Sequence, residues 1–238
     1  MIISFKYKFI FIKTYKTAGS SIENYLYPHL NNKDILAQTK DYNGINCGGD
    51  FDAENMKYHF SEESLRKKIN YKMRYFPHMP IWLVKERLEP ISNKLNYDIF
   101  ENFYKFGVIR NPFDTIVSHY YWKNANNINK NLKLISFNEI LKELESNIFP
   151  QYGLLNLNKL MDKNYNEIIC NKIIKYEDLN NELSIVFNKL GIDFDGKLKI
   201  FKKKSNNRKH YKNFFDKDSK KLIKDIFWKD FEMFNYSF

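Results

Sequence analysis

Residues 13–21 contain the side chains and the backbone freedom that a phosphate-binding loop needs. The loop follows an apolar segment, 8–12, that predicts a buried strand, and it leads into a helix that we expect over 20–30. A helix N-terminus offers unpaired N–H groups and the positive end of the helix dipole. Gly19 lets the backbone approach an anion closely, and Lys16 adds a mobile positive charge. The pattern therefore predicts a phosphate cradle, although not one of the Walker type, because its Lys precedes the Gly.

Arg110 is a second candidate ligand for an anion. It follows an apolar and aromatic run, 103–109, that predicts a central strand, and Asn111 with Pro112 predicts that a helix begins directly afterwards. In an open parallel sheet, ligands bind beyond the carboxyl ends of the strands. Arg110 would then lie at the same sheet edge as the loop 13–21, and two adjacent anion sites suit a molecule with two separated phosphate groups. An ordinary strand–helix junction with a surface arginine is the alternative.

Strands and helices alternate along the chain, which predicts an α/β fold with a central parallel sheet flanked by helices. Helical patterns occur near 62–74, over 81–88, from 112 to 122, after a capping box at Ser136 and Glu139, from 178 to 190 where Gly191 ends the pattern, and around 219–228. Polar residues over 124–131 predict a loop, and 168–174 predicts one broken strand or two short ones. No linker divides the chain, so we expect a single domain, 1–238.

Lys and Arg outnumber Asp and Glu by 39 to 28, which leaves a net charge of +11. This charge allows a nucleic acid, a phosphorylated cofactor, an acidic glycan or an anionic membrane as partner, as well as a merely solvated basic surface. The two cysteines, Cys47 and Cys170, have no metal-ligand spacing and predict free thiols in a reducing compartment. No run reaches the roughly 18 apolar residues of a membrane span, and the N-terminus lacks a signal pattern. We therefore expect a cytoplasmic protein without a membrane span.

Taken together, the two motifs resemble those of the sulfotransferases that use 3′-phosphoadenosine 5′-phosphosulfate (PAPS). The closest likeness is to the carbohydrate branch, sulfotransferase family 2, which includes heparan and chondroitin sulfotransferases. The likeness lies in residues 16–21, in 110–114 with Ser118 and Tyr120, in 175–179 and in 234–238. It implies a P-loop-like three-layer fold with the parallel sheet in the middle. The chain departs from the family pattern at Tyr15, where a Pro is usual, and at Lys13, where a His is frequent.

By this resemblance, PAPS is the donor and adenosine 3′,5′-bisphosphate (PAP) is the product. The residues implied in binding the 5′-phosphosulfate are Lys16, Thr17, Ala18, Gly19, Ser20 and Ser21, and we expect Lys13 to bind the cofactor as well. Arg110 and Ser118 are implied in binding the 3′-phosphate. Ser118 lies about two turns into the predicted helix, so it reaches the same ligand only if the helix runs past that ligand. The basic loop 202–212 either closes over the 3′-phosphate, contacts an acidic acceptor or is solvated charge, and Arg208 is its first candidate for a phosphate contact.

Sulfuryl transfer to a hydroxyl group needs in-line placement, charge stabilisation on the leaving oxygen and a base for the hydroxyl proton. Lys16 suits the leaving oxygen, because its ammonium group can neutralise charge that develops as the S–O bond breaks. The candidates for the base are, in order, His78, His59 and a carboxylate such as Glu23 or Glu101. His78 comes first because the segment 78–88 resembles the family segment that carries the usual base. His119 points about 100° away from Ser118 on the predicted helix, so we interpret it as structural.

The expected function is transfer of a sulfuryl group from PAPS to a hydroxyl group of a carbohydrate, without a metal ion or a nucleic acid. One alternative is a P-loop kinase that uses ATP. Against it stand the absence of a Lys after Gly19 and of an obvious Mg²⁺-binding carboxylate at a strand end. The other is a non-enzymatic basic module that binds nucleic acid, which would explain the net charge but not the two spaced anion motifs. No residue pattern indicates the identity of the acceptor or the oligomeric state.

Overall fold

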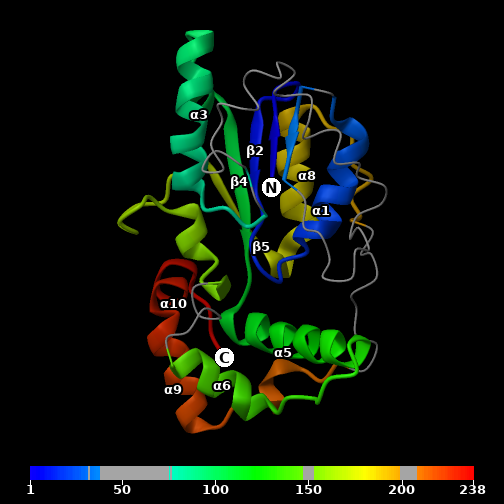
Figure 1. Ribbon diagram of the computed structural model, residues 1–238, viewed down its shortest axis with the longest axis vertical. Helices are drawn as coiled ribbons and strands as arrows, with labels where there is room; N and C mark the ends of the chain where they lie inside the picture. The colour runs from blue at the N-terminus through cyan, green and yellow to red at the C-terminus, as the bar shows by residue number, and fades with distance from the viewer. Residues whose placement is uncertain (32, 38–74, 76, 147–152, 199–207) are drawn as a thin grey trace.

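The computed structural model describes residues 1–31, 33–37, 75, 77–146, 153–198 and 208–238, and within them one sheet forms the centre of the protein (Figure 1). Its strands are β1 (Ile2–Ser4), β2 (Phe9–Ile12), β3 (Ile35–Leu36), β4 (Tyr104–Ile109) and β5 (Lys172–Lys175), in the order β3-β1-β2-β4-β5. The three strands β2, β4 and β5 are parallel, whereas β1 is antiparallel to both of its neighbours. The predicted α/β fold is confirmed, but β1 runs opposite to the other four strands of the described sheet. The short turn 5–8 folds β1 directly back onto β2, and only antiparallel strands can be joined in that way.

Helices cover the sheet and also build a second group below it in Figure 1. The α-helices are α1 (Gly19–Leu26), α3 (Ile81–Leu95), α4 (Ile99–Asn102), α5 (Pro112–Asn129), α6 (Phe137–Glu145), α8 (Leu179–Leu190), α9 (Lys217–Ile226) and α10 (Trp228–Phe234). The 3₁₀ helices are η1 (Tyr27–His29), η5 (Leu157–Leu160), η6 (Tyr176–Asp178) and η7 (Tyr211–Asn213). The second group consists of α5, α6, α9 and α10, which pack around the buried ring of Phe113 and its apolar neighbours.

Side chains alternate across β2 and make both faces of the sheet apolar. Ile10 and Ile12 pack into a cluster with residues of α3, whereas Phe9 and Phe11 pack with residues of α1 and α8. All four side chains are fully buried, which explains why the strand is a continuous apolar run. Figure 1 shows α3 on one side of the sheet and α1 with α8 on the other, which is the predicted three-layer arrangement.

Local capping signals act as predicted. Asn111 caps α5 by accepting a hydrogen bond from the backbone N–H two residues further on (3.0 Å), and Pro112 occupies the first helical position. Ser136 and Glu139 form the capping box of α6. Gly191 follows α8 in the left-handed conformation, with φ 69°. These signals depend only on neighbouring residues, so they can be recognised without the tertiary structure.

The predicted end of the helix after Asn111 is wrong. α5 does not stop at 122 but continues to Asn129, so most of the segment 124–131 is helix and not loop. Asn124 is one reason. Its side-chain amide donates to the carbonyl of Ile135 at 3.0 Å and accepts from the N–H of Ile135 at 2.9 Å. A side chain satisfied in this way no longer competes with the hydrogen bonds of the helix.

Three other boundaries differ from the prediction. α3 runs beyond 88 because Pro90 lies exposed and removes only one backbone hydrogen bond. The predicted helix 20–30 ends as an α-helix at Leu26, and η1 continues it with Pro28 in its first turn. The segment 168–174, predicted as one broken strand or two short ones, forms an isolated antiparallel bridge from Ile168 to Met161 and then β5. The terminal helix is divided into α9 and α10.

No helix in the described part of the chain has the length and apolar character needed to cross a bilayer. The cytoplasmic location stays a prediction. Cys170 is a free thiol, whereas Cys47 and the predicted helix 62–74 lie outside the described residues.

Asp230 is a buried carboxyl group in the first turn of α10, and it predicts a pH dependence of stability. Burial raises its pKa from 3.8 to about 7. Between these values the unfolded chain has released the proton whereas the folded chain retains it, so the free energy of unfolding falls as pH rises through this window. We expect Asp230→Asn to raise the melting temperature at pH 8 by about 3–8 °C and to change it little at pH 4.

Thermal unfolding followed by circular dichroism between pH 4 and pH 8 would test this prediction. Asp225→Asn is the matched control, because Asp225 is an exposed carboxylate on the preceding helix. As an exposed surface substitution, it should change the melting temperature little at either pH. An equal effect of Asp230→Asn at pH 4 and pH 8 would contradict the assigned cause.

Candidate active site

The carboxyl ends of β2 and β4 lie side by side, which places the loop 13–18 next to Arg110. Thr14 fastens this loop to β4, because its hydroxyl group donates to the carbonyl of Val108. The hydroxyl oxygens of Thr14 and Thr17 lie 2.7 Å apart, and both side chains are buried. The hydroxyl group of Thr17 therefore bonds within the loop, and only its backbone remains to contact a ligand.

The backbone of the loop has the shape of an anion-binding nest. Lys16 and Ala18 both have φ 60°, in the left-handed region, whereas Thr17 between them does not. Such alternation turns successive N–H groups toward one side, where they can surround an anion. Ala18 is the N-cap of α1, and no side chain of the described residues caps this helix. The loop and the first turn of α1, with Gly19 and Ser20, thus present backbone donors to a ligand.

Lys13 lies beneath the loop and does not point into the nest. Its ammonium group pairs with Glu23, which also pairs with the amino group of Met1, and all three groups are buried. The Lys13 side chain passes so close to Gly19 that a Cβ on Gly19 would lie 2.7 Å from Cγ of Lys13. Gly19 is therefore required by packing as well as by ligand approach. This placement makes Lys13 a support of the loop, in contrast to the contact with the cofactor that we expected from the sequence.

Arg110 joins the two predicted anion motifs. Its Nη1 atom donates to the carbonyl of Lys16 at 2.8 Å, and its Nε atom donates to the carboxylate of Asp114 at 2.7 Å. The guanidinium carbon lies 3.9 Å from the centre of the Tyr176 ring. Because three different segments hold it, the nearly buried guanidinium group has one defined orientation. The ammonium group of Lys16 lies 5.3 Å from the ring centre of Trp122, which places it along α5.

Asp114 gathers two arginines at the first turn of α5. Its carboxylate pairs with Arg110 and with Arg208, and Arg208 also donates to the carbonyl of Asp114 at 3.0 Å. Ser118 is four residues further along α5 and partly exposed, so it lies on the same helix face as Asp114. Arg110, Arg208 and Ser118 are thus brought to one side of this helix. Of the basic loop 202–212, residues 208–212 are described, and residues 202–207 lie outside the described part of the chain.

The segment after β5 and the C-terminus support the start of α5. Glu177 accepts hydrogen bonds from the backbone N–H of Asn111 at 2.7 Å and from the hydroxyl group of Tyr236 at 3.1 Å. The amide group of Asn111 donates to the carbonyl of Ser237 at 2.9 Å. Two segments that carry part of the family likeness therefore meet beside Arg110. Their contribution in this structure is to hold the strand–helix junction in place.

His78 lies against the same loop. Its ring stacks on the ring of Tyr15 with a centroid distance of 4.0 Å, and Nδ1 lies 3.2 Å from the carbonyl of Lys13. Burial lowers the pKa of His78 to about 2, and the positive charges of Lys13, the Met1 amino group and Lys159 act in the same direction. The imidazole is therefore neutral at physiological pH and free to accept a proton, but with so low a pKa it is a weak base in the absence of substrates.

The other candidate bases are placed less favourably. Burial alone would raise the pKa of Glu23, but its two ammonium partners outweigh this effect and keep the pKa below its ordinary value. Glu101 lies on α4, before the first residue of β4 and thus at the opposite sheet edge from Arg110, where it pairs with Lys85 at 3.2 Å. His59 lies outside the described residues. Among the candidates in the described part of the chain, His78 is thus the one that lies at the loop without an ion-pair partner.

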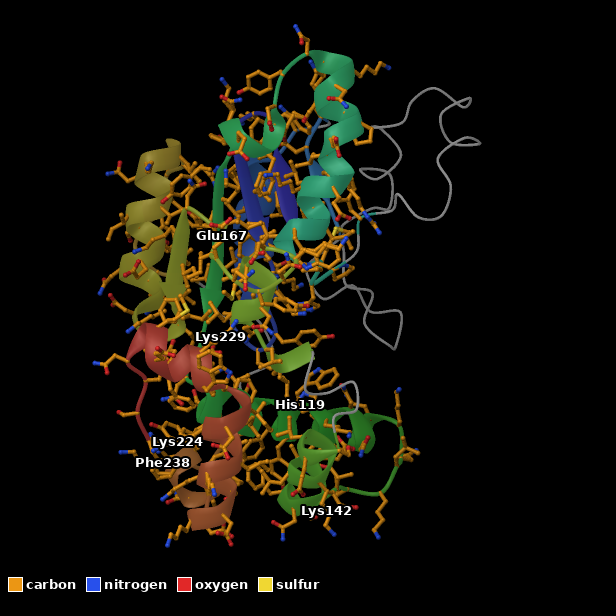
Figure 2. All side chains as sticks on the ribbon, turned by 90° about the vertical axis from the view of Figure 1, so that its left-hand side faces the viewer. His119, Lys142, Glu167, Lys224, Lys229 and Phe238 are labelled. Carbon is orange, nitrogen blue, oxygen red and sulfur yellow. The ribbon has the colours of Figure 1, made fainter. Side chains whose placement is uncertain are left out.

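His119 is buried on α5, in the lower half of Figure 2. Its ring lies 5.5 Å from that of Trp122. Burial, together with the charges of Lys16 and Lys123, lowers the pKa of His119 to about 4. The imidazole is neutral and packed, in keeping with the structural interpretation.

Two residues of the site, Asn156 and Lys159, carry no signal in the sequence. Asn156 is buried, and its side chain pairs with both backbone groups of Tyr15, at 2.7 Å to the N–H and 2.9 Å to the carbonyl. Lys159 lies on η5, with its ammonium group 5.7 Å from the centre of the Tyr15 ring. No periodicity, cap or charge pattern distinguishes these two residues from other Asn and Lys residues of the chain. Only the packing of η5 on the sheet brings them to the loop.

No group of three His, Cys, Asp or Glu side chains in the described part of the chain is arranged to hold a metal ion. The site consists instead of a backbone nest, two arginines and a neutral imidazole at the carboxyl ends of parallel strands. Such an arrangement at the edge of the sheet is typical of α/β proteins that bind anionic ligands.

The chain matches the sulfotransferase family over residues 1–237, and it belongs to that family. It is therefore an enzyme of the sulfuryl-transferring class, and the predicted family is confirmed. Among solved structures, it is similar to a sulfotransferase from Alicyclobacillus acidocaldarius, with 14% sequence identity, a TM-score of 0.45 and coverage of 96% of each chain. It matches no curated protein.

Proposed function

We propose that the protein transfers a sulfuryl group from PAPS to a hydroxyl group of a carbohydrate, as a single sulfotransferase domain spanning 1–238. Membership of the sulfotransferase family supports the sulfuryl transfer itself. The choice of PAPS rests chiefly on the hydrogen bond from Arg110 to the carbonyl of Lys16. This contact brings a guanidinium group to the same sheet edge as the backbone nest. Two cationic sites so close together fit a ligand with phosphate groups on both sides of one adenosine.

The described residues fit the two ends of PAPS in different ways. The backbone of 16–21, the ammonium group of Lys16 and the hydroxyl groups of Ser20 and Ser21 would hold the 5′-phosphosulfate. The residues that would hold the 3′-phosphate are Arg110, Ser118 and Arg208, which the structure gathers around Asp114. Thr17 would contribute only its backbone, and Lys13 would act from beneath the loop.

In the proposed reaction, the oxygen of the acceptor hydroxyl group forms a bond to sulfur while the bond from sulfur to the phosphate oxygen breaks. PAP leaves with the electron pair of that bond, and Lys16 balances the charge that develops on the leaving oxygen. The hydroxyl proton passes to the neutral imidazole of His78. No step in this scheme requires a metal ion.

A thermal-shift titration tests the donor. PAP without magnesium should raise the melting temperature by about 5–10 °C at a concentration 100-fold above its Kd, and ADP should do much less. Stabilisation by ATP with magnesium, and not by PAP, would instead indicate the kinase. A response only to DNA or RNA would indicate the nucleic-acid-binding module.

His78→Ala should lower kcat by about 10²–10⁴-fold and leave the Kd of PAP nearly unchanged. The reason is that His78 contacts the loop from the side of Tyr15 and is not among the proposed phosphate ligands. Because burial keeps the pKa of His78 near 2, the rate should show no decline from protonation of this group between pH 8 and pH 5. Single-turnover kinetics and calorimetry with PAP would measure the two effects. His210→Ala is the control, since His210 is exposed, and unchanged turnover of His78→Ala would remove His78 from the mechanism.

A further inference from the structure

Lys159 lies near the ring of Tyr15, on which the candidate base His78 stacks, and the mechanism above gives it no role. Its ammonium group is 5.7 Å from the centre of the Tyr15 ring, and that ring stacks on His78 at 4.0 Å. The side chain is only partly exposed. Three segments that are far apart in the chain therefore place an amine, a phenol ring and an imidazole together.

The position of Lys159 is set by two strong constraints on η5. At one end, Asn156 pairs with the N–H and the carbonyl of Tyr15. At the other, Leu160 packs on Gly107 of β4, where a Cβ would lie only 2.4 Å from a methyl carbon of Leu160. A Pro in place of Tyr15 could not donate the hydrogen bond to Asn156. The full pair of hydrogen bonds between Asn156 and the backbone of residue 15 therefore depends on Tyr15, at which this chain departs from the usual pattern of its family.

The charges around His78 are unequally balanced. Its cationic neighbours are Lys13, the amino group of Met1 and Lys159. The first two share the carboxylate of Glu23. Lys159 has no carboxylate partner among the described residues, and burial lowers its pKa to about 8. A half-buried ammonium group without a counter-charge is a favourable partner for an anion.

We propose that Lys159 binds an anionic group of the acceptor, a carboxylate or a sulfate ester, and that this pairing prepares His78 to receive the hydroxyl proton. The inference rests on the proposed function and specifies its acceptor as an acidic sugar. The bound anion supplies the missing counter-charge and lowers the positive potential at His78. His78 therefore becomes a stronger base only when an acidic acceptor is in place. Lys159 selects the substrate, and the substrate in turn activates the base.

Three glycosides with the same p-nitrophenyl aglycone allow a direct test: p-nitrophenyl β-D-glucuronide, p-nitrophenyl β-D-glucoside 6-sulfate and the neutral p-nitrophenyl β-D-glucoside. Calorimetry gives the Kd of each for the full chain, and transfer of labelled sulfate from PAPS gives kcat/KM. At least one acidic glycoside should have a Kd about 10–100-fold lower and a kcat/KM about 10–100-fold higher than the neutral one, the effect of one hydrogen bond to a charged group. Lys159→Met should reduce this ratio to about 1, and Lys159→Arg should largely restore it.

Lys163→Met is the matched control. Lys163 is exposed and pairs with Glu86 at 3.2 Å, so its loss should leave the ratio unchanged. If Lys159 has a merely structural role, Lys159→Met should weaken the binding of the acidic and the neutral glycosides equally. This result would overturn the inference. Equal binding of all three glycosides by the wild type would overturn it as well. Neither outcome affects stabilisation by PAP, which tests the proposed function separately.

Discussion

Replacement of Lys16 by Met is expected to lower kcat for sulfuryl transfer by about 10²–10³-fold, with a change of no more than about tenfold in the Kd of PAP. The ammonium group would act mainly on charge that develops as the S–O bond breaks, so its loss should affect the transition state more than the bound ground state. Lys13 cannot replace it, because its ammonium group is buried against Glu23. Met keeps the aliphatic stem, which preserves packing toward Trp122. Rapid-quench kinetics with saturating PAPS would measure kcat.

Two further variants sharpen the result. Lys16→Arg keeps the charge and should recover part of kcat. Lys13→Met should lower the melting temperature, because it removes one of the two cations that compensate the buried carboxylate of Glu23. A kcat of Lys16→Met within threefold of the wild type would mean that Lys16 does not stabilise the leaving oxygen.

Arg110→Ala is expected to weaken the binding of PAP by about 100-fold, the upper effect of one hydrogen bond to a charged group. It removes the proposed ligand of the 3′-phosphate and also the hydrogen bond that holds the carbonyl of Lys16. Asp114 keeps Arg208 as its partner, so the variant should remain folded. Calorimetric titration with PAP measures the loss, and a melting curve without ligand checks the fold.

Arg208→Ala provides the comparison for this result. Within the described residues, the hydrogen bonds of Arg208 all go to Asp114 and none to the loop 13–18, so its loss should weaken PAP binding by about 10-fold. Arg110→Lys should recover little, because a lysine cannot reproduce the fork that reaches Asp114 and the carbonyl of Lys16 together. Equal Kd values for PAP in Arg110→Ala and the wild type would contradict the placement of the 3′-phosphate.

The sequence determined those features that depend on residues close together in the chain. One anion site is indicated by an apolar strand, then a loop that contains Lys and Gly, and then a helix. The other is indicated by the strand that ends before Arg110 and by the capped helix that follows Arg110. Both units form as expected, because strand hydrophobicity and helix caps act over a few residues. The boundaries that were predicted wrongly, such as the end of α5, depend on contacts such as that between Asn124 and Ile135.

The tertiary structure alone decided which side chains face the site. Lys13 and Lys16 are both loop lysines in the sequence, but Lys13 is buried because Glu23 on α1 comes to lie beside it. Asn156 and Lys159 reach the loop only because Gly107 leaves room for Leu160 on the sheet. The pairing of Asp114 with Arg208 likewise joins residues far apart in the chain. Such contacts follow from how the layers pack, and they cannot be predicted from the spacing of residues along one segment.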